Sequence, residues 1–268
     1  MRALALRLFV GDLPLAAGAE FDLPPEAARH ALVRRVQPGV LLGLFDGSGA
    51  DWPAEVTVIG QRGRVSVRLQ ASPQPAPAAE LPIAVTLAFG MPANERVDAL
   101  VEKATELGAA ALQPLMSERS VLRLRDERAL RRRAHWQAVA ASACEQCGRA
   151  TVPAVHEVRS LDEWLRELPA APSPGPGFVL STDPSAPLLP AAWPHEPGPP
   201  VRITLLSGPE GGLTAEEEGA ALARGFLPVS LGRRVLRADT APLAALGWIA
   251  LTSEARLSAG PSPTPKSR

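Results

Sequence analysis

The chain has 268 residues, 46% of them hydrophobic, and its 28 basic side chains balance its 28 acidic ones. This length suits one or two domains with a sizeable core, and the balanced charge excludes a polycation that binds nucleic acid along its whole length. The two cysteines exclude a disulfide scaffold, no apolar run approaches the length of a membrane span, and Arg2 and Arg7 interrupt any signal-peptide pattern. We therefore expect a cytoplasmic protein.

Residues 1–72 are predicted to form a small β-barrel. Short apolar or alternating runs are separated there by turn residues such as Asp46–Gly49, which is typical of a barrel of short strands. Four runs are expected to be strands: residues 4–10, 40–45, 54–59 and 64–69. The residues around Gly63 favour a hairpin connection between the last two of these strands.

A short helix over residues 25–36 is predicted between the first two strands. It carries Arg29, Arg34 and Arg35, which are candidates for RNA contacts because a guanidinium binds phosphate with two hydrogen bonds. The alternative is an ordinary solvated helix face. After this domain, residues 73–80 are predicted to be a linker, since alternating prolines favour extended backbone.

Residues 81–258 are predicted to alternate strands and helices, which indicates an α/β domain with a parallel sheet covered by helices on both faces. The expected strands are residues 83–89, 109–115, 178–180, 201–206 and a segment that ends at Leu231. The expected helices are residues 94–107, 126–147, 160–168, one from Thr214 onward and one over 239–257. The remaining segments are expected to be extended at 151–158, a proline-rich loop at 184–200 and a disordered tail at 259–268.

A glycine-rich loop, Gly208–Gly212, follows the strand at 201–206. Thr214 and Glu217 have the spacing of a capping box, so a helix is expected to begin directly after the loop. A strand, a glycine-rich loop and a helix N-terminus together indicate a site for a small polar molecule, and the alternative is a tight structural turn. The loop is not a P-loop, because no Gly-Lys-Ser/Thr follows, and its order does not match the dinucleotide fingerprint.

The segment Ser230–Ala241 has a similar organisation, with a strand, a basic turn and a helix that Asp239 is expected to cap. Ligands of parallel sheets bind outside the carboxyl ends of the strands. We therefore expect the strand ends at Leu180, Ser207 and Leu231 to meet at one site.

Two further patterns lie between Ser117 and Arg149. Cys144 and Cys147 have the spacing of half a zinc site, but no second pair of ligands matches them, and we favour a structural role. The same segment has eight arginines against four acids, which indicates a basic surface that attracts RNA. Arg119 and Arg149 are the RNA-binding candidates here, and the alternative is a solvated helix face.

Several motifs together resemble the RsmE-type methyltransferases, which methylate N3 of a uridine in 16S ribosomal RNA, uridine 1498 in standard rRNA numbering. The resemblance runs from Arg7 to about Leu251. It rests on five motifs in order and spacing: Lys103–Gly108, Ser117–Ser120, Glu145–Arg149, Gly208–Gly212 and Leu231–Arg237. Phe45–Gly47 in the first domain is also similar to the family. One departure is Ala238 and Asp239, where the family usually has threonine and glutamate.

The resemblance implies a SPOUT fold for the second domain, with a C-terminal trefoil knot, and a PUA-like RNA-binding barrel for the first. It also implies S-adenosylmethionine (SAM) as cofactor, no metal, a homodimer, and 16S rRNA within the 30S subunit as partner. The implied cofactor-binding residues are Leu180, Ser181, Gly208, Pro209, Leu231, Gly232 and Leu236.

The chemistry implied by the resemblance suggests roles for two residues. Uridine N3 carries a proton, so an enzyme must stabilise the anion, remove the proton, or do both. Arg237 is the first catalytic candidate, because a fixed guanidinium stabilises negative charge on the uracil oxygens. Glu210 is the second, either as a general base or as a residue that holds the loop by accepting backbone N–H groups.

Two other classes of function are considered. A catalytically silent RNA-binding assembly protein would use the same barrel and basic helix without binding a cofactor. A nucleotide-binding or hydrolytic enzyme would need a Walker lysine, a nucleophile elbow or metal ligands, and the sequence contains none of these patterns.

Overall fold

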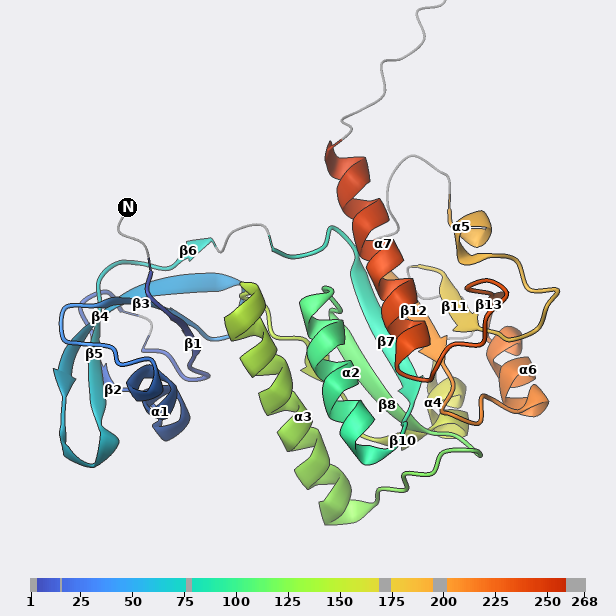
Figure 1. Ribbon diagram of the computed structural model, residues 1–268, viewed down its shortest axis with the longest axis horizontal. Coiled ribbons are helices and arrows are strands. Elements are labelled where there is room, and N and C mark those ends of the chain that lie inside the picture. Colours follow the sequence, from blue (N-terminus) through green and yellow to red (C-terminus); the bar gives the residue numbers. More distant parts are fainter. Residues whose placement is uncertain (1–3, 15, 76–78, 169–174, 195–201, 259–268) are drawn as a thin grey trace, which may run out of the picture. The chain divides into compact units, whose positions relative to one another are not determined.

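The computed structural model describes residues 4–14, 16–75, 79–168, 175–194 and 202–258 (Figure 1). The predicted tail at 259–268 and part of the predicted linker lie outside these residues. The chain divides into two compact units, which are described separately. Unit 1 comprises residues 1–80 and 140–152, and unit 2 comprises residues 81–139 and 153–268.

Unit 1 is built on a mixed six-stranded sheet in which β1 pairs with β3 in parallel and the other pairs are antiparallel. Its strands are β1 (Arg7–Phe9), β2 (Glu20–Asp22), β3 (Leu41–Phe45), β4 (Ala50–Ile59), β5 (Val65–Leu69) and β6 (Gln74–Pro75). The helix α1 (Pro25–Val33) and the short 3₁₀ turn η1 (Gln61–Gly63) complete it. Leu8, Leu42 and Val67 are fully buried in its core.

The predicted strands and helix of unit 1 are all present, with shifted ends, but β2 and β6 were not predicted. β2 is only three residues long, with Phe21 partly buried between two exposed residues. This is too short for an alternating pattern to identify a strand. β6 falls in the predicted linker and pairs with Ala50 and Asp51 of β4. Pro75 is tolerated there because it lies at the edge of the sheet.

Residues 140–152 also belong to unit 1, although the sequence analysis assigned them to the second domain. They contain the last turns of α3 (Asp126–Cys147) and the segment after it. The carboxylate of Glu145 accepts hydrogen bonds from the backbone N–H of Phe9 at 2.8 Å and from Nδ1 of His30 at 2.9 Å. Unit 1 is therefore discontinuous in sequence.

Unit 2 has a parallel seven-stranded sheet in the order β10-β8-β7-β12-β11-β13, with β9 beside β8. The strands are β7 (Ala84–Gly90), β8 (Ala111–Met116), β9 (Ala154–Val155), β10 (Arg159–Ser160), β11 (Gly177–Leu180), β12 (Arg202–Ser207) and β13 (Phe226–Val229). The helices, besides α3, are α2 (Asn94–Glu106), α4 (Leu161–Glu167), α5 (Leu189–Ala192), α6 (Ala215–Ala223) and α7 (Thr240–Ser258).

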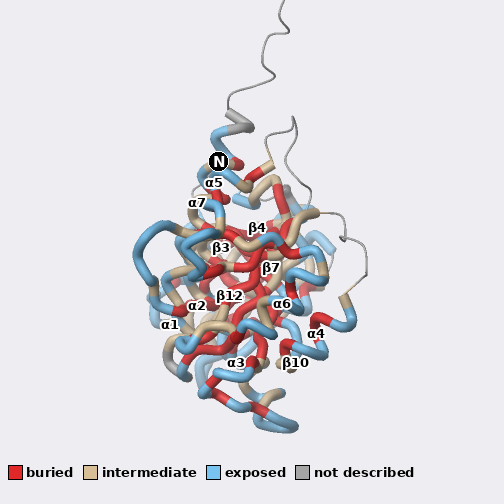
Figure 2. The backbone as a smooth tube through the Cα atoms, turned by 90° about the vertical axis from the view of Figure 1, so that its right-hand side faces the viewer, coloured by how far each residue is buried: buried red, intermediate tan, exposed pale blue. Residues whose placement is uncertain are grey.

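Helices cover both faces of this sheet, as the sequence predicted. On one face, Trp164 of α4 and Ala221 of α6 pack against Ala88, Val179 and neighbouring strand residues. On the other face, α7 contacts β7, β12 and the helix α2. Buried backbone follows β7 and β12 through the middle of the sheet (Figure 2). In the part of the chain that the structure describes, no helix is long and apolar enough to span a membrane.

Candidate functional site

The carboxyl ends of β11, β12 and β13 surround a cavity of about 1140 Å³ in unit 2. Leu180, Ser207 and Leu231, the three strand ends expected to meet, all line it. They meet because β11 lies between β12 and β13 in the parallel sheet, so the three strands end at the same edge. The cavity also contains all seven residues that the resemblance assigns to cofactor binding: Leu180, Ser181, Gly208, Pro209, Leu231, Gly232 and Leu236.

The glycine-rich loop after β12 folds back on itself, and this path requires glycine at two positions. A Cβ atom at Gly208 would lie 2.8 Å from the backbone nitrogen of Leu213. Gly212 has a φ of +69°, a conformation that side chains disfavour, and its N–H donates to the carbonyl of Pro209 at 2.9 Å. The two glycines therefore let the backbone of the loop come close to the cavity.

Glu210 joins this loop to the start of α2. Its Oε1 atom accepts a hydrogen bond from the backbone N–H of Ala93 at 3.0 Å and lies 3.5 Å from Nη1 of Arg96. Gly90, at the end of β7, makes room for the loop, since a Cβ there would lie 2.5 Å from Cδ of Pro209. This geometry supports the loop-holding alternative for Glu210, because its carboxylate is already engaged.

On the opposite side, the loop is bonded to the turn after β8. Nη1 of Arg119 donates to the carbonyl of Gly211 at 2.9 Å and to that of Leu213 at 3.4 Å. Arg119 is exposed and lines the cavity. The sequence makes this residue a candidate RNA contact or part of a solvated helix face, and nothing in it indicates the bonds to the loop.

The helix α6 begins directly after the loop, and the predicted capping box is confirmed. Oγ1 of Thr214 accepts from the backbone N–H of Glu217 at 3.2 Å, and Oε2 of Glu217 accepts from that of Thr214 at 3.0 Å. The other oxygen of Glu217 accepts from the backbone N–H of Glu118 at 2.7 Å.

The turn after β13 is exposed and basic. Gly232 has a φ of +109°, and its N–H donates to Oγ of Ser230 at 3.1 Å. Arg237 lines the cavity, and no hydrogen bond or ion pair of its guanidinium is recorded with the described residues. Altogether five arginines and three carboxylates line the cavity: Arg96, Arg119, Arg233, Arg234, Arg237, Asp183, Glu210 and Glu218. A positive excess at this position suits an anionic ligand.

Asp239 was predicted to cap the last helix, but its buried carboxylate oxygen makes no capping hydrogen bond among the described residues. α7 begins at Thr240, and Oδ1 of Asp239 is buried without a hydrogen-bond partner among the described residues. The first turn of α7 is instead supported by the N–H of Ala241, which donates to the carbonyl of Arg237 at 2.9 Å.

The segment after Ser181 also belongs to the site, although the sequence does not indicate this. Asp183 lines the cavity, and its Oδ1 accepts from both N–H and Oγ of Ser185 at 2.8 Å. These bonds lower the pKa of Asp183, which therefore stays ionised. Leu188 bridges to Ser230, and α5 follows, inside the predicted loop. The Asp-Pro-Ser sequence indicated a turn, but nothing local indicated that it would meet β13.

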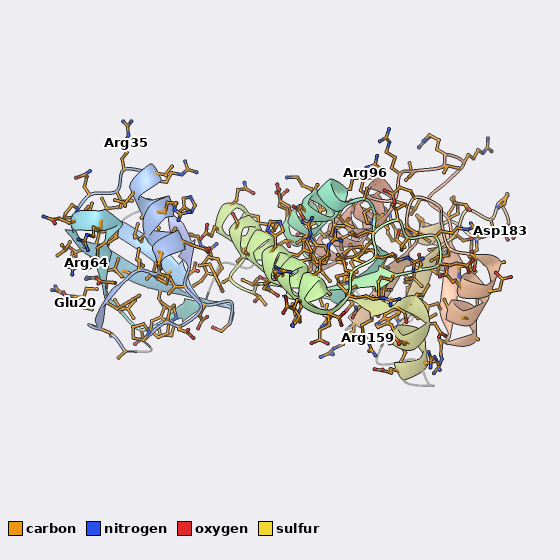
Figure 3. The ribbon with its side chains drawn as sticks, turned by 90° about the horizontal axis from the view of Figure 1, so that it is seen from below. Glu20, Arg35, Arg64, Arg96, Arg159 and Asp183 are labelled. Carbon is orange, nitrogen blue, oxygen red and sulfur yellow. The ribbon has the colours of Figure 1, made fainter. Side chains whose placement is uncertain are left out.

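Of the arginines predicted to bind RNA in or near the barrel, three are exposed and one is buried. Arg29, Arg34 and Arg35 lie on or just after α1 at the surface, and Arg35 points away from the sheet of unit 1 (Figure 3). Arg149 is only 2% exposed, and its guanidinium bonds to the carboxylate of Glu80 at 2.7 and 3.0 Å. Its placement corrects the surface position expected from the sequence, because a buried, paired guanidinium does not reach RNA.

The two cysteines lie in unit 1, where Cys144 is buried beside Phe45 and Ala150. A hydrogen bond between the two thiols raises the pKa of Cys144 and lowers that of Cys147. Within the described ranges, no group of three or more histidine, cysteine, aspartate or glutamate side chains is placed to hold a metal ion.

The chain is similar to known RNA methyltransferases over both units. Residues 79–250 match the family model of an RNA methyltransferase domain, and residues 23–70 match that of an RNA methyltransferase PUA domain. The chain is 35% identical over 225 residues to the ribosomal RNA small subunit methyltransferase E of Synechocystis sp., which covers 83% of this chain and 70% of that protein.

Solved structures give the same result. The structure resembles that of a ribosomal RNA small subunit methyltransferase E from Neisseria gonorrhoeae bound to SAM, with a TM-score of 0.81 and 34% identity over 92% of this chain and 97% of that one. It also resembles the structure of a methyltransferase from Legionella pneumophila in complex with the bound cofactor SAM. The TM-score is 0.82 and the identity 30%, over 92% of this chain and 97% of that one.

Proposed function

Because this chain belongs to the ribosomal RNA small subunit methyltransferase E family, we propose that it uses SAM to methylate N3 of a uridine in 16S ribosomal RNA. Family membership makes unit 2 a SPOUT-type methyltransferase domain and unit 1 a PUA-like domain. The N3 position, uridine 1498 as the target, the trefoil knot, the homodimer and a cytoplasmic location on the 30S subunit are parts of the proposal that rest on the family resemblance.

The observation that carries the proposal is the cavity at the three strand ends. Its volume of about 1140 Å³ admits a ligand as large as SAM. Leu180, Leu231 and Leu236 offer apolar surface for an adenine ring, while the backbone of the glycine-rich loop offers polar groups at close range. The residues present therefore fit a cofactor that is apolar in one part and polar in another.

The chain's own residues would supply positioning and charge stabilisation. When bound, SAM supplies an activated methyl group on a sulfonium, so the transfer needs no metal. The uracil must leave its base stack, because N3 lies on the pairing edge. Arg237, which is exposed at the cavity, would stabilise the negative charge on the uracil oxygens when N3 gives up its proton to water.

Glu210 has a positioning role in this proposal. Its Oε1 atom is bonded to Ala93 and lies near Arg96, so the carboxylate holds the glycine-rich loop against the start of α2. The exposed arginines of α1, Arg29, Arg34 and Arg35, would contact RNA phosphates and hold the substrate.

The first test is calorimetric titration of the purified protein with SAM. Gly208→Arg should abolish binding, because even a Cβ at this position meets loop backbone at 2.8 Å. Gly219→Arg is the matched control, since Gly219 is exposed on α6 and a Cβ there meets no atom within 4 Å. Methyl transfer to 30S subunits that lack the modification follows.

The outcomes separate the proposal from its alternative. SAM binding by wild type and by Gly208→Arg alike would contradict the placement of the cofactor. RNA binding by a wild-type protein that binds no SAM, with or without RNA present, would favour a catalytically silent RNA-binding assembly protein.

A further inference from the structure

We propose that Arg119 is a positioning residue that sets the shape of the glycine-rich loop for the cofactor, and that it is not primarily an RNA contact. The inference rests on the proposed function, in which SAM occupies the cavity beside this loop. It concerns the turn after β8, which the proposed reaction does not otherwise use.

Arg119 bonds to the part of the loop that is least able to order itself. Its Nη1 atom donates to the carbonyls of Gly211 and Leu213 at 2.9 and 3.4 Å, on either side of Gly212. A Cβ at Gly211 would lie 3.0 Å from Cβ and 3.2 Å from Cδ of Arg119, so the arginine side chain lies directly on the glycine. Glycine has high backbone entropy, and external bonds are therefore needed to fix one conformation.

The turn that carries Arg119 is itself rigid. Ser117 and Ser120 are 2% and 6% exposed, and their hydroxyl groups lie 3.0 Å apart. The N–H of Ser117 donates to Oγ of Ser120 at 3.0 Å, and the N–H of Ser120 donates to the carbonyl of Ser117 at 3.2 Å. Buried hydroxyl groups bonded in this way hold a single backbone conformation.

The same turn also holds the far end of the loop. The backbone N–H of Glu118 donates to Oε1 of Glu217 at 2.7 Å. Glu217 is the partner of the N-cap residue Thr214 in the capping box of α6. Arg119 and Glu118 therefore fix two successive parts of the segment from Gly211 to the first turn of α6. A loop that is ordered before the cofactor arrives loses less entropy on binding, which increases affinity.

The test is the affinity for SAM in the absence of RNA, because an RNA contact would not affect it. We expect Arg119→Ala to weaken SAM binding about tenfold, the loss typical of a hydrogen bond from a charged donor. Arg119→Lys should recover part of the affinity, since its ammonium group still donates to a carbonyl. Arg128→Ala is the matched control: Arg128 is exposed at the start of α3, and the described contacts include none between it and the loop.

Steady-state methylation gives a second readout. The KM for SAM should rise in Arg119→Ala, while the KM for 30S subunits stays near that of wild type. Unchanged SAM affinity together with a raised KM for 30S subunits would overturn the inference and make Arg119 an RNA contact. A wild-type protein that binds no SAM would instead contradict the proposed function.

Circular dichroism shows whether each variant is folded. If Arg119→Ala does not fold, Gly211→Ala tests the same contact from the loop side, because its Cβ crowds Arg119 at 3.0 Å. SAM binding by Gly211→Ala as tight as by wild type would then contradict the inference, whereas weaker binding would support it.

Discussion

The buried arginines of unit 1 and the exposed arginines at the cavity of unit 2 have opposite roles. In unit 1, the side chains of Arg7 and Arg149 are only 15% and 3% exposed, and they bond to carboxylates and to backbone carbonyls around the end of α3. In unit 2, the cavity is lined by exposed arginines, among them Arg237. A buried guanidinium must be fully paired to offset its desolvation, whereas an exposed one keeps hydrogen-bond donors for a ligand. Arg7 and Arg149 therefore contribute to stability, whereas Arg237 stays available for chemistry.

Replacing Arg237 at the cavity should affect activity strongly and stability very little. Arg237→Ala should lower kcat for methyl transfer by about a hundredfold or more, because it removes a group that stabilises charge in the transition state. The free energy of unfolding should change by less than about 0.5 kcal/mol, as is usual for an exposed side chain. Single-turnover methylation of 30S subunits and chemical denaturation measure the two quantities.

Arg166→Ala is the control for that experiment, since Arg166 is exposed on α4 and pairs only with Asp162 within its own helix among the recorded ion pairs. It should leave kcat unchanged. Full activity in Arg237→Ala with normal SAM binding would remove Arg237 from the reaction.

For the buried Arg149 of unit 1, we expect a loss of stability. Arg149→Ala should lower the free energy of unfolding by about 2 kcal/mol, because it removes the hydrogen bonds from a buried guanidinium to the carboxylate of Glu80, whose side chain is 37% exposed. Arg34→Ala, at an exposed position after α1, should change it by less than about 0.5 kcal/mol. Urea denaturation of the full chain measures both, and equal small losses would show that Arg149 is not the structural residue inferred here.

The smallest expected effect compares two helix caps within unit 2. Thr214 caps α6 beside the cavity, and Ser160 caps α4, which does not line it. Thr214→Ala and Ser160→Ala should each cost about 1 kcal/mol of stability. Only Thr214→Ala should also weaken SAM binding, because its helix begins at the end of the glycine-rich loop. Equal SAM affinity in both variants would show that this helix start does not shape the cavity.

The organisation of unit 2 could be predicted because its signals are local. The box formed by Thr214 and Glu217 is a pattern of four residues, and α3 runs from Asp126 to Cys147 as its sequence predicts. The strand ends at Leu180, Ser207 and Leu231 meet because strands that alternate with helices form a parallel sheet, whose carboxyl ends share one edge. The alternation of strands with helices, together with the turn residues between them, was therefore enough to predict where the cavity lies.

The arrangement of unit 1 could not be predicted in the same way, because it depends on contacts between distant residues. The N–H of Phe9 and the carboxylate of Glu145 are 136 positions apart, and neither residue indicates its partner. The residues around Arg149 in the sequence do not distinguish it from a solvated arginine. Its burial depends on Glu80, which is 69 positions away and bonds to its guanidinium in the folded structure. The bonds from Arg119 to the glycine-rich loop were missed for the same reason, since they join residues 92 and 94 positions apart.

We propose that this chain methylates N3 of a uridine in 16S ribosomal RNA. The most direct measurement incubates the protein with SAM carrying a labelled methyl group and 30S subunits that lack the modification, then digests the RNA and identifies the labelled nucleoside by mass spectrometry. We expect 3-methyluridine as the labelled product of the wild-type protein and no labelled product with Gly208→Arg. Label in another nucleoside, or no label although SAM binds, would contradict the proposal.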